Sequence, residues 1–216
     1  MRIDPAGWPF IGIGLAAAAL VAAFAGSAYG VAALVLPAFF LFFFRDPDRE
    51  VDAGPRDVVS PADGRVMVAG EPTGSFAGGG WRQITIFLSP MDVHVNRMPV
   101  SGRVTAVKYH PGRFLPAYRA DAGDLNEHTE VTLDHGGLTI VVRQIVGILA
   151  RRIVCRVREG DVVSAGARFG VMKFGSRMDV FLPQGSTIRV KVGDRVSAGI
   201  TLIGELPPVS PGGPRS

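Results

Sequence analysis

Two long apolar stretches open the chain, over residues 8–24 and 29–44. No charged residue lies between Asp4 and Arg45. As a helix, each stretch is roughly 25 Å long at about 1.5 Å per residue, slightly less than the ~30 Å hydrocarbon core of a bilayer. The pattern therefore predicts an N-terminal apolar helical membrane anchor over residues 1–49.

This anchor has two possible arrangements, a single long tilted span or a tight hairpin with both ends on one side of the membrane. Small residues at positions 25–28 permit the turn that a hairpin needs. A cleavable signal peptide fits less well, because the apolar length is about twice that of a signal peptide's hydrophobic region. In the hairpin, Arg2 on one flank and Arg45 and Arg49 on the other favour cytoplasmic ends. We therefore expect the protein at the cell membrane, on its cytoplasmic side.

After Pro47 the pattern changes to short β-branched runs separated by turn signals such as Pro-Ala-Asp-Gly and His-Gly-Gly. Residues 50–206 are therefore predicted to form a mostly antiparallel β domain, in which residues 115–125 form an irregular loop. The Pro/Gly/Ser-rich residues 207–216 are predicted to be a disordered tail. The predicted strands are 58–59, 65–68, 83–88, 102–109, 130–133 and 138–146.

A Gly-Asp pattern occurs twice near the C-terminus. It reads Glu159-Gly160-Asp161-Val162-Val163-Ser164-Ala165-Gly166 and then Val192-Gly193-Asp194-Arg195-Val196-Ser197-Ala198-Gly199. A Gly-Asp turn followed by a strand and a second glycine is typical of a hairpin unit. The predicted fold class is therefore mainly β, a β-sandwich that contains two related C-terminal units, together with the helical anchor.

Composition restricts the function only modestly. The chain has 216 residues, a formal net charge of +4 and one cysteine. A single cysteine excludes an intramolecular disulfide, and the small basic excess suits an anionic membrane surface. No pair of His, Cys or carboxylate residues has the spacing of metal ligands, so we expect no metal site. We also expect no nucleic-acid partner.

The candidate chemistry lies at Gly175-Ser176, which interrupts an apolar strand pattern. By itself this dipeptide usually indicates only a turn. Glycine leaves its carbonyl unshielded and tolerates unusual backbone angles, and the next serine places a hydroxyl beside that carbonyl. An N→O acyl shift needs this arrangement, because the Ser176 Oγ attacks the Gly175 carbonyl carbon and turns the amide into an ester. Loss of the Ser176 Hα then expels the Gly175 carboxylate, and hydrolysis of the dehydroalanine releases ammonia and leaves a pyruvoyl group.

The surrounding sequence resembles the processing segment of phosphatidylserine decarboxylase proenzymes, in particular their short bacterial and archaeal form. That segment reads Phe174-Gly175-Ser176-Arg177-Met178-Asp179-Val180-Phe181-Leu182-Pro183. Four further segments agree in order, and the resemblance covers nearly the whole chain except its last dozen residues. They are Phe44-Arg45-Asp46-Pro47, Ser60-Pro61-Ala62-Asp63-Gly64, Phe87-Leu88-Ser89-Pro90-Met91-Asp92-Val93-His94-Val95-Asn96-Arg97-Met98-Pro99 and Asn126-Glu127-His128-Thr129.

The resemblance implies a self-processing, pyruvoyl-dependent enzyme that converts membrane phosphatidylserine to phosphatidylethanolamine. Cleavage between residues 175 and 176 gives a large chain, 1–175, and a small chain, 176–216, which stay together. The pyruvoyl group derived from Ser176 forms a Schiff base with the substrate amine. Its carbonyl and the adjacent amide stabilise the carbanion left by loss of CO₂. The resemblance implies no metal.

Asp63 matches the aspartate of the family's self-cleavage triad, but the histidine match is incomplete. The family motif His-x-x-His-Met-Pro appears here as His94-Val95-Asn96-Arg97-Met98-Pro99. Arg97 therefore replaces the second histidine, and an arginine cannot act as a base at neutral pH. His94 is the implied general acid/base of decarboxylation. For the processing step the alternatives are His94, His128 and Glu127.

Without the resemblance, these residues have ordinary structural interpretations. Asp63 in Pro-Ala-Asp-Gly is by type a turn aspartate, and His94 is by type a hydrogen-bonded, half-buried side chain. The sequence does not identify the residues that bind the head-group phosphate. The conceivable side chains are Arg97, Arg113 and Lys173.

A membrane-tethered carrier domain is the alternative function. Gly160-Asp161-x-Val163-x-x-Gly166 followed by Val171-Met172-Lys173 also resembles the hammerhead of biotinyl and lipoyl carriers, whose modified lysine follows a methionine. However, Lys173 comes a few residues too early after the Gly-Asp turn, and Phe174-Gly175 replaces the residue expected next. Hammerhead-like architecture in the C-terminal units explains the likeness without shared function. A membrane-anchored structural β domain is a third alternative, and it predicts an uncut chain.

Overall fold

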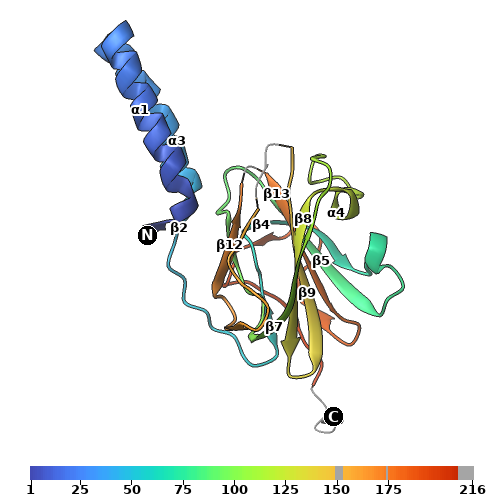
Figure 1. Cartoon of the computed structure of the whole chain (residues 1–216). Helices are drawn as coiled ribbons and strands as arrows, with labels where there is room; N and C mark the ends of the chain where they lie inside the picture. Colours follow the sequence, from blue (N-terminus) through green and yellow to red (C-terminus); the bar gives the residue numbers. More distant parts are fainter. Residues whose placement is uncertain (149–152, 174, 209–216) are drawn as a thin grey trace.

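A computed structural model describes residues 1–148, 153–173 and 175–208, so most of the predicted tail lies outside the described residues. A helical hairpin projects beside a β domain (Figure 1). The elements are β1 (Arg2–Ile3), η1 (Pro5–Gly7), α1 (Trp8–Ala25), α2 (Ser27–Ala33), α3 (Val35–Phe43), β2 (Arg45–Asp46), β3 (Asp57–Val59), β4 (Gly64–Gly70), η2 (Gly74–Phe76), β5 (Trp81–Leu88), β6 (Val95–Arg97), β7 (Gly102–His110), α4 (Ala122–Leu125), β8 (His128–His135), β9 (Leu138–Ile145), β10 (Ile153–Cys155), β11 (Val162–Val163), β12 (Arg168–Met172), β13 (Ser176–Pro183), β14 (Thr187–Ile188), β15 (Arg195–Val196) and β16 (Leu202–Glu205).

The apolar N-terminus forms a hairpin, one of its two predicted arrangements. Gly26, with a φ of 105°, separates α1 from α2, and both α2 and α3 pack against α1. Antiparallel pairing of β1 with β2 closes the base of the hairpin. The helical segment Pro5–Ala25 is long and apolar enough to cross a membrane by length and composition.

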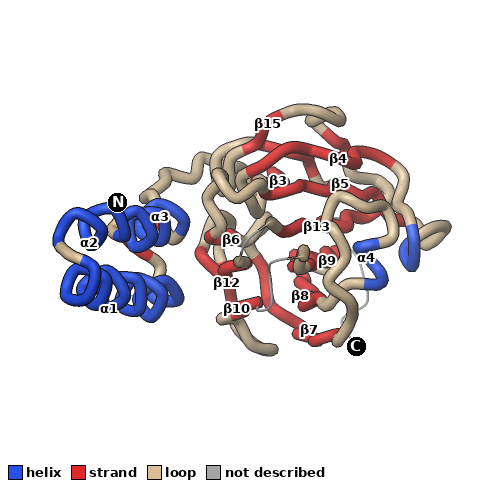
Figure 2. Tube along the Cα trace, turned by 90° about the horizontal axis from the view of Figure 1, so that it is seen from above, coloured by secondary structure: helices blue, strands red, loops and turns tan. Residues whose placement is uncertain are grey.

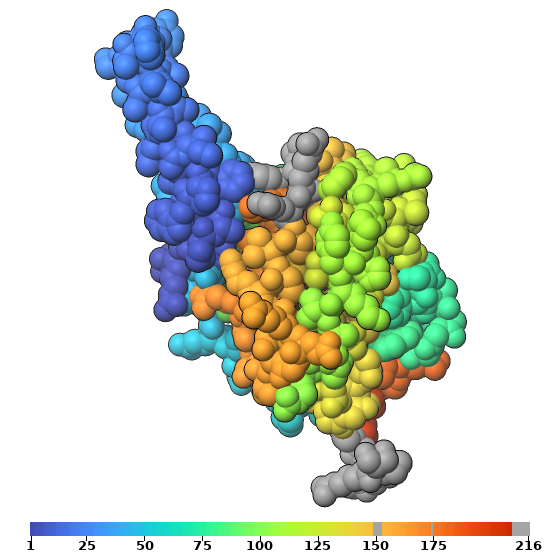
Figure 3. Space-filling view, viewed as in Figure 1, coloured from blue at the N-terminus to red at the C-terminus, as the bar shows by residue number. Residues whose placement is uncertain are grey.

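Much of the hairpin surface is apolar and exposed. The hairpin projects away from the β domain (Figure 3). Phe24 is 88% exposed and Val35 is 72% exposed. At the base of the hairpin the apolar side chains are instead buried. Phe43 and Phe44 are fully buried where the hairpin meets the β domain. A large exposed apolar surface is typical of a membrane or protein contact, so the two ends of the hairpin have different environments.

Eight strands form the central sheet, in the order β11-β7-β8-β9-β13-β5-β4-β15. Its middle strand, β13, pairs antiparallel with β5 from Ser176 to Pro183 and with β9 from Arg177 to Phe181. Alternate side chains of a strand point to the same face of the sheet. Met178, Val180 and Leu182 are accordingly buried together in the main core. The predicted strands at 83–88, 102–109 and 130–133 fall within strands of this sheet, and the one at 138–146 extends one residue beyond β9.

A second sheet, β10-β12-β6, lies between the hairpin and the central sheet (Figure 2). Phe169 and Met172 of β12 are buried in the same core as the inward side chains of β13. Strands β14, β16 and β3 form a further three-stranded sheet. The mainly β fold class is confirmed, and its description as a β-sandwich with hammerhead-like C-terminal units stays a prediction.

The repeated Gly-Asp pattern occupies both edges of the central sheet. Its first copy contains β11, at one edge, and its second copy contains β15, at the other. The two glycines make equivalent bonds, because Gly160 N–H donates to the Val104 carbonyl at 2.8 Å and Gly193 N–H donates to the Val66 carbonyl at 2.9 Å. Unpaired sheet edges invite association with other chains. The repeat therefore closes the sheet with short strands at both edges.

Candidate active site

Gly175 and Ser176 lie at the start of the central strand β13. Gly175 has a φ of 69°, in the left-handed region that favours glycine. Ser176 is opposite Leu88 of β5 and is fully buried. Its Oγ has no hydrogen-bond partner among the described residues. A buried hydroxyl without a partner lowers stability by about 1–3 kcal/mol, and such groups are often retained for chemistry.

The side chain of Ser176 faces the interior between the two sheets. It lies on the same face of β13 as Met178, which belongs to the main core. On the other side of the peptide bond, Gly147 confines the Gly175 carbonyl. A Cβ at Gly147 would collide with this carbonyl oxygen and would also contact Ala117 at 3.4 Å. The carbonyl therefore fits only because residue 147 has no side chain.

His94 is buried in the segment between β5 and β6. Its Nδ1 lies 2.9 Å from the Asp92 carbonyl oxygen. A carbonyl only accepts, so we assign the proton to Nδ1 and a free lone pair to Nε2. Nε2 is buried without a hydrogen-bond partner in the described part of the chain. Burial lowers the pKa of His94 to about 4, and the bond to Asp92 opposes this only partly. The ring is thus neutral at pH 7 and able to accept a proton.

Asp63 lies near His94 but bonds to other groups. Its charge is among those that raise the pKa of His94. Its carboxylate accepts hydrogen bonds from Arg49 at 2.5 and 2.8 Å and from the Ala198 N–H at 2.8 Å. Among the described residues, only the Nδ1 of His94 has a hydrogen-bond partner, and that partner is the Asp92 carbonyl. In the uncut chain Asp63 therefore ties the segment after the hairpin to the second repeat.

Arg97, which replaces the family's second histidine, is buried and engaged. Its guanidinium donates to the carbonyls of Gly166 at 3.0 Å and Pro47 at 2.9 Å. It also pairs with Asp46 at 3.3 Å. These contacts join the end of the hairpin to the first repeat. They leave Arg97 poorly placed to bind a head group.

The two other candidate head-group ligands are Lys173 and Arg113. Lys173 follows β12, and its Nζ lies 4.6 Å from the Phe10 ring centroid and 6.0 Å from that of Phe44. It therefore lies where the hairpin meets the site. Arg113 is exposed, in a loop that forms a parallel bridge with Asn126.

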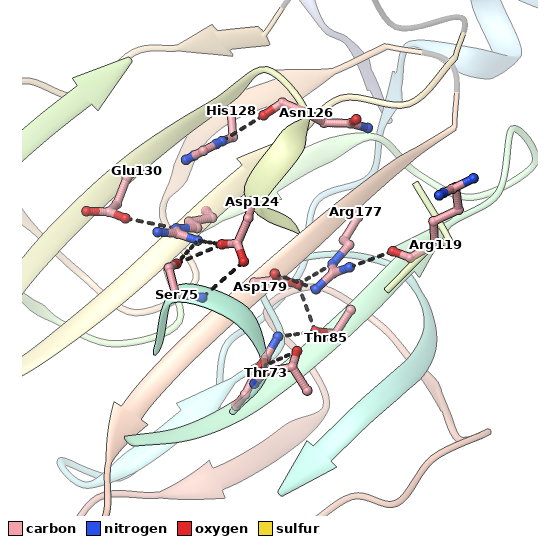
Figure 4. Close-up of polar contacts among 12 residues, drawn as sticks. Thr73, Ser75, Thr85, Arg119, Asp124, Asn126, His128, Glu130, Arg177 and Asp179 are labelled. Carbon is pink, nitrogen blue, oxygen red and sulfur yellow. Dashed lines mark hydrogen bonds and ion pairs between the residues drawn. The ribbon is translucent and has the colours of Figure 1, made fainter. Parts of the chain in front are cut away.

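His128 and Glu127, the other candidates for the processing base, both interact with groups other than Gly175 and Ser176. The Nδ1 of His128 bonds to the Asn126 carbonyl at 2.8 Å, as Figure 4 shows, and its ring stacks on His110 at 4.5 Å. His128 belongs to β8, which is separated from β13 by β9. Two strand spacings amount to roughly 10 Å. Glu127, just before β8, interacts with the Tyr109 hydroxyl. Burial, and after it this carboxylate, raise the pKa of that tyrosine.

Arg177, the residue after Ser176, fixes a loop over the outer face of β13 (Figure 4). Its Nε and Nη2 donate to Asp179 at 2.7 and 2.8 Å, and its Nη1 donates to the Arg119 carbonyl at 3.1 Å. Asp179 also accepts from the Thr85 hydroxyl at 2.8 Å. The predicted irregular loop 115–125 is thus held in place, and it ends in the short helix α4.

An apolar pocket with a volume of about 390 Å³ opens beside Gly175. Its walls come from the end of β5 and the segment after it, from loop 115–125, from the segment after β9 and from Gly175. Apolar walls suit the glycerol and acyl part of a lipid better than a charged head group. The lining residues are Phe87, Pro90, Pro116, Ala117, Tyr118, Ile148 and Gly175.

The sequence prediction missed three residues that shape this site. Arg177 had a visible signal, because an arginine inside an apolar strand pattern needs a buried partner. Gly147 and Arg49 have no such signal, since each acts on a residue far away in the sequence. Among the described residues, no group of three His, Cys, Asp or Glu side chains is arranged to hold a metal ion.

The geometry agrees with what the chain is similar to. A family model described as phosphatidylserine decarboxylase matches residues 36–204, which include both His94 and Ser176. A protein of Symbiobacterium thermophilum is 46% identical over 203 residues, covering 93% of this chain and 94% of that protein. One of Solibacter usitatus is 48% identical over 188 residues, covering 87% and 89%. Both relatives are named phosphatidylserine decarboxylase proenzyme. The chain therefore belongs to the phosphatidylserine decarboxylase family.

Proposed function

We propose that this protein cuts itself between Gly175 and Ser176 and then decarboxylates phosphatidylserine to phosphatidylethanolamine. One observation carries the proposal. In a chain of this family, a buried serine hydroxyl that has no partner among the described residues directly follows a glycine in the left-handed conformation.

Self-cleavage starts at the Ser176 hydroxyl. Its proton passes to a base as Oγ attacks the Gly175 carbonyl carbon, and the peptide nitrogen then leaves as a protonated amine. The same base removes the Ser176 Hα, the Gly175 carboxylate departs, and one water releases one ammonia to give the pyruvoyl end. His94 suits the role of this base. Its imidazole is neutral at pH 7, and the buried Nε2 has no hydrogen-bond partner among the described residues.

The residues present fit a pyruvoyl group at position 176. It supplies a carbonyl that condenses with the substrate amine and accepts the electrons released with CO₂. The Nε2 of His94 can take up the proton that the substrate ammonium loses on condensation and return it to the substrate α-carbon. The apolar pocket beside Gly175 receives the glycerol end of the lipid. Lys173 and Arg113 are the proposed ligands of the head-group phosphate.

The two chains produced by the cut stay associated in this proposal. The small chain, 176–216, contributes β13, which lies between β5 and β9 of the large chain, 1–175. Backbone pairing on both sides of β13 and its buried Met178, Val180 and Leu182 support a stable complex after cleavage.

We also propose a division into an anchor, residues 1–49, a catalytic domain, residues 50–206, and a disordered tail, residues 207–216. The shared core of the two sheets supports a β-sandwich, and the paired repeats support hammerhead-like C-terminal units. Because β1 and β2 pair at the base of the hairpin, Arg2 and Arg45 lie on one side of a membrane. The positive-inside tendency makes this the cytoplasmic side.

The alternative, a carrier modified at Lys173, has less support. A carrier lysine must reach distant partners from an exposed turn, whereas Lys173 is half-buried against Phe10 and Phe44 of the hairpin. The family match also favours the decarboxylase.

Replacement of the serine tests the proposed reaction. We expect Ser176→Ala to abolish phosphatidylethanolamine formation from phosphatidylserine, because no other residue supplies the carbonyl. Ser186→Ala is the matched control, since Ser186 is also a buried serine of the small chain whose Oγ has no partner among the described residues. It should retain activity. Equal losses in both variants, measured by lipid product analysis, would contradict the proposal.

Replacement of His94 tests the base. We expect His94→Ala to lower product formation at least ~100-fold, within the usual range for a general acid or base. His135→Ala, at the end of β8, should have little effect. With a pKa of about 4, His94 becomes neutral as the pH rises through 4 and stays a competent base above it. Self-cleavage should therefore be lost as the pH falls through about 4, and an inflection near 6.5 would oppose the assignment.

The close approach of Gly147 to the Gly175 carbonyl allows a test of whether the position of this carbonyl controls self-cleavage. Gly147→Ala should slow self-cleavage at least ~10-fold, because its methyl group displaces the Gly175 carbonyl and a small misplacement can reduce a rate up to ~100-fold. Gly12→Ala is the control, since a Cβ there meets no atom within 4 Å. The fraction of cut chain after fixed times would be measured by denaturing electrophoresis. Wild-type kinetics for folded Gly147→Ala would refute the proposed confinement.

A further inference from the structure

The end of the hairpin nearest the β domain directly contacts His94, the proposed proton acceptor. Phe43, the last residue of α3, is fully buried, and its ring centroid lies 4.2 Å from that of His94, with an angle of 32° between the rings. Both rings are completely covered. A contact this close fixes the plane of the imidazole and removes water from one of its faces.

A second contact from the hairpin base supports the same histidine. The Arg45 guanidinium donates to the Met91 carbonyl at 2.7 Å. The next residue, Asp92, provides the carbonyl that bonds to His94 Nδ1. The segment that orients the imidazole is therefore held by the residue that follows the anchor helices. Phe43 and Arg45 therefore both act on His94 from the short segment that joins α3 to β2.

We propose that the membrane anchor completes the active site, and that Phe43 is a positioning residue for His94. The Phe43 ring holds the imidazole in place and keeps its Nε2 dry. This inference rests on the role of His94 given under Proposed function. Loss of the hairpin base then impairs the chemistry itself, in addition to any loss of membrane binding.

The charges around His94 support this view. Burial is the largest influence on its pKa and lowers it, and Arg45 lowers it further, whereas Asp92 and Asp63 raise it. The two acidic groups alone would favour the protonated ring, so the neutral base depends on the dry surroundings. Without the Phe43 ring, water reaches the imidazole and its pKa rises toward the ordinary 6.5.

The test compares Phe43→Ala with Phe24→Ala, the same change at an 88% exposed position of the hairpin. The full chain is kept in detergent, so that membrane targeting is not limiting. At pH 5 an imidazole with a pKa of about 4 is about 90% neutral, and one with a pKa of about 6 is about 10% neutral. We therefore expect Phe43→Ala to slow self-cleavage roughly tenfold at pH 5 and Phe24→Ala to leave the rate unchanged.

A second measurement does not depend on activity. The His94 imidazole is titrated by NMR in the uncleavable Ser176→Ala background, with and without the Phe43 replacement. We expect its pKa to rise in Phe43→Ala and, less strongly, in Phe43→Leu, which keeps an apolar side chain and provides a folded variant if the alanine form misfolds. An unchanged His94 pKa in the folded Phe43 variants would overturn the inference.

The two experiments separate the inference from the function on which it rests. If His94→Ala remains fully active, His94 is not the base and the proposed function fails at this residue. The titration still reports whether Phe43 controls the environment of His94. If His94→Ala is inactive but Phe43→Ala matches Phe24→Ala in both rate and titration, only the role of Phe43 is refuted.

Discussion

Two-sided pairing of β13 is the constraint on which the rest of the structure depends. Its first residue, Ser176, is held between the sheets, while β5 and β9 hold the strand from both sides. The Gly175-Ser176 bond, at which we propose the cut, therefore lies at the start of this strand. In the proposed reaction the peptide bond breaks without loss of the fold, because the strand pairs that join the two chains lie after the cut.

The same enclosure explains the chemistry that the site can perform. Dry surroundings keep His94 neutral, and they leave its Nε2 and the Ser176 hydroxyl without competing partners among the described residues. The charged residues nearby are instead committed to structure, as the Asp63–Arg49 and Arg97–Asp46 pairs illustrate. The substitution of arginine at the family's second histidine thus has a structural use here. It joins the hairpin to the β domain.

Local patterns predicted the parts of the molecule that depend on local properties. Alternating side chains located most strands of the central sheet, and the Gly175-Ser176 pair indicated the bond at which we propose the cut. Contacts between distant segments were not predictable, because a single sequence contains no measure of them. Gly147 beside Gly175, Arg49 on Asp63 and Phe43 on His94 all belong to this class. The choice between a hairpin and a single span also needed the observed pairing of β1 with β2.

Intact mass spectrometry of the purified protein under denaturing conditions tests the central claim most directly. The account predicts two chains, residues 1–175 and 176–216, with the small chain lighter by one ammonia than a chain that begins with serine. Its N-terminus should also be blocked to sequencing. A single uncut chain of 216 residues in correctly folded protein would contradict the account.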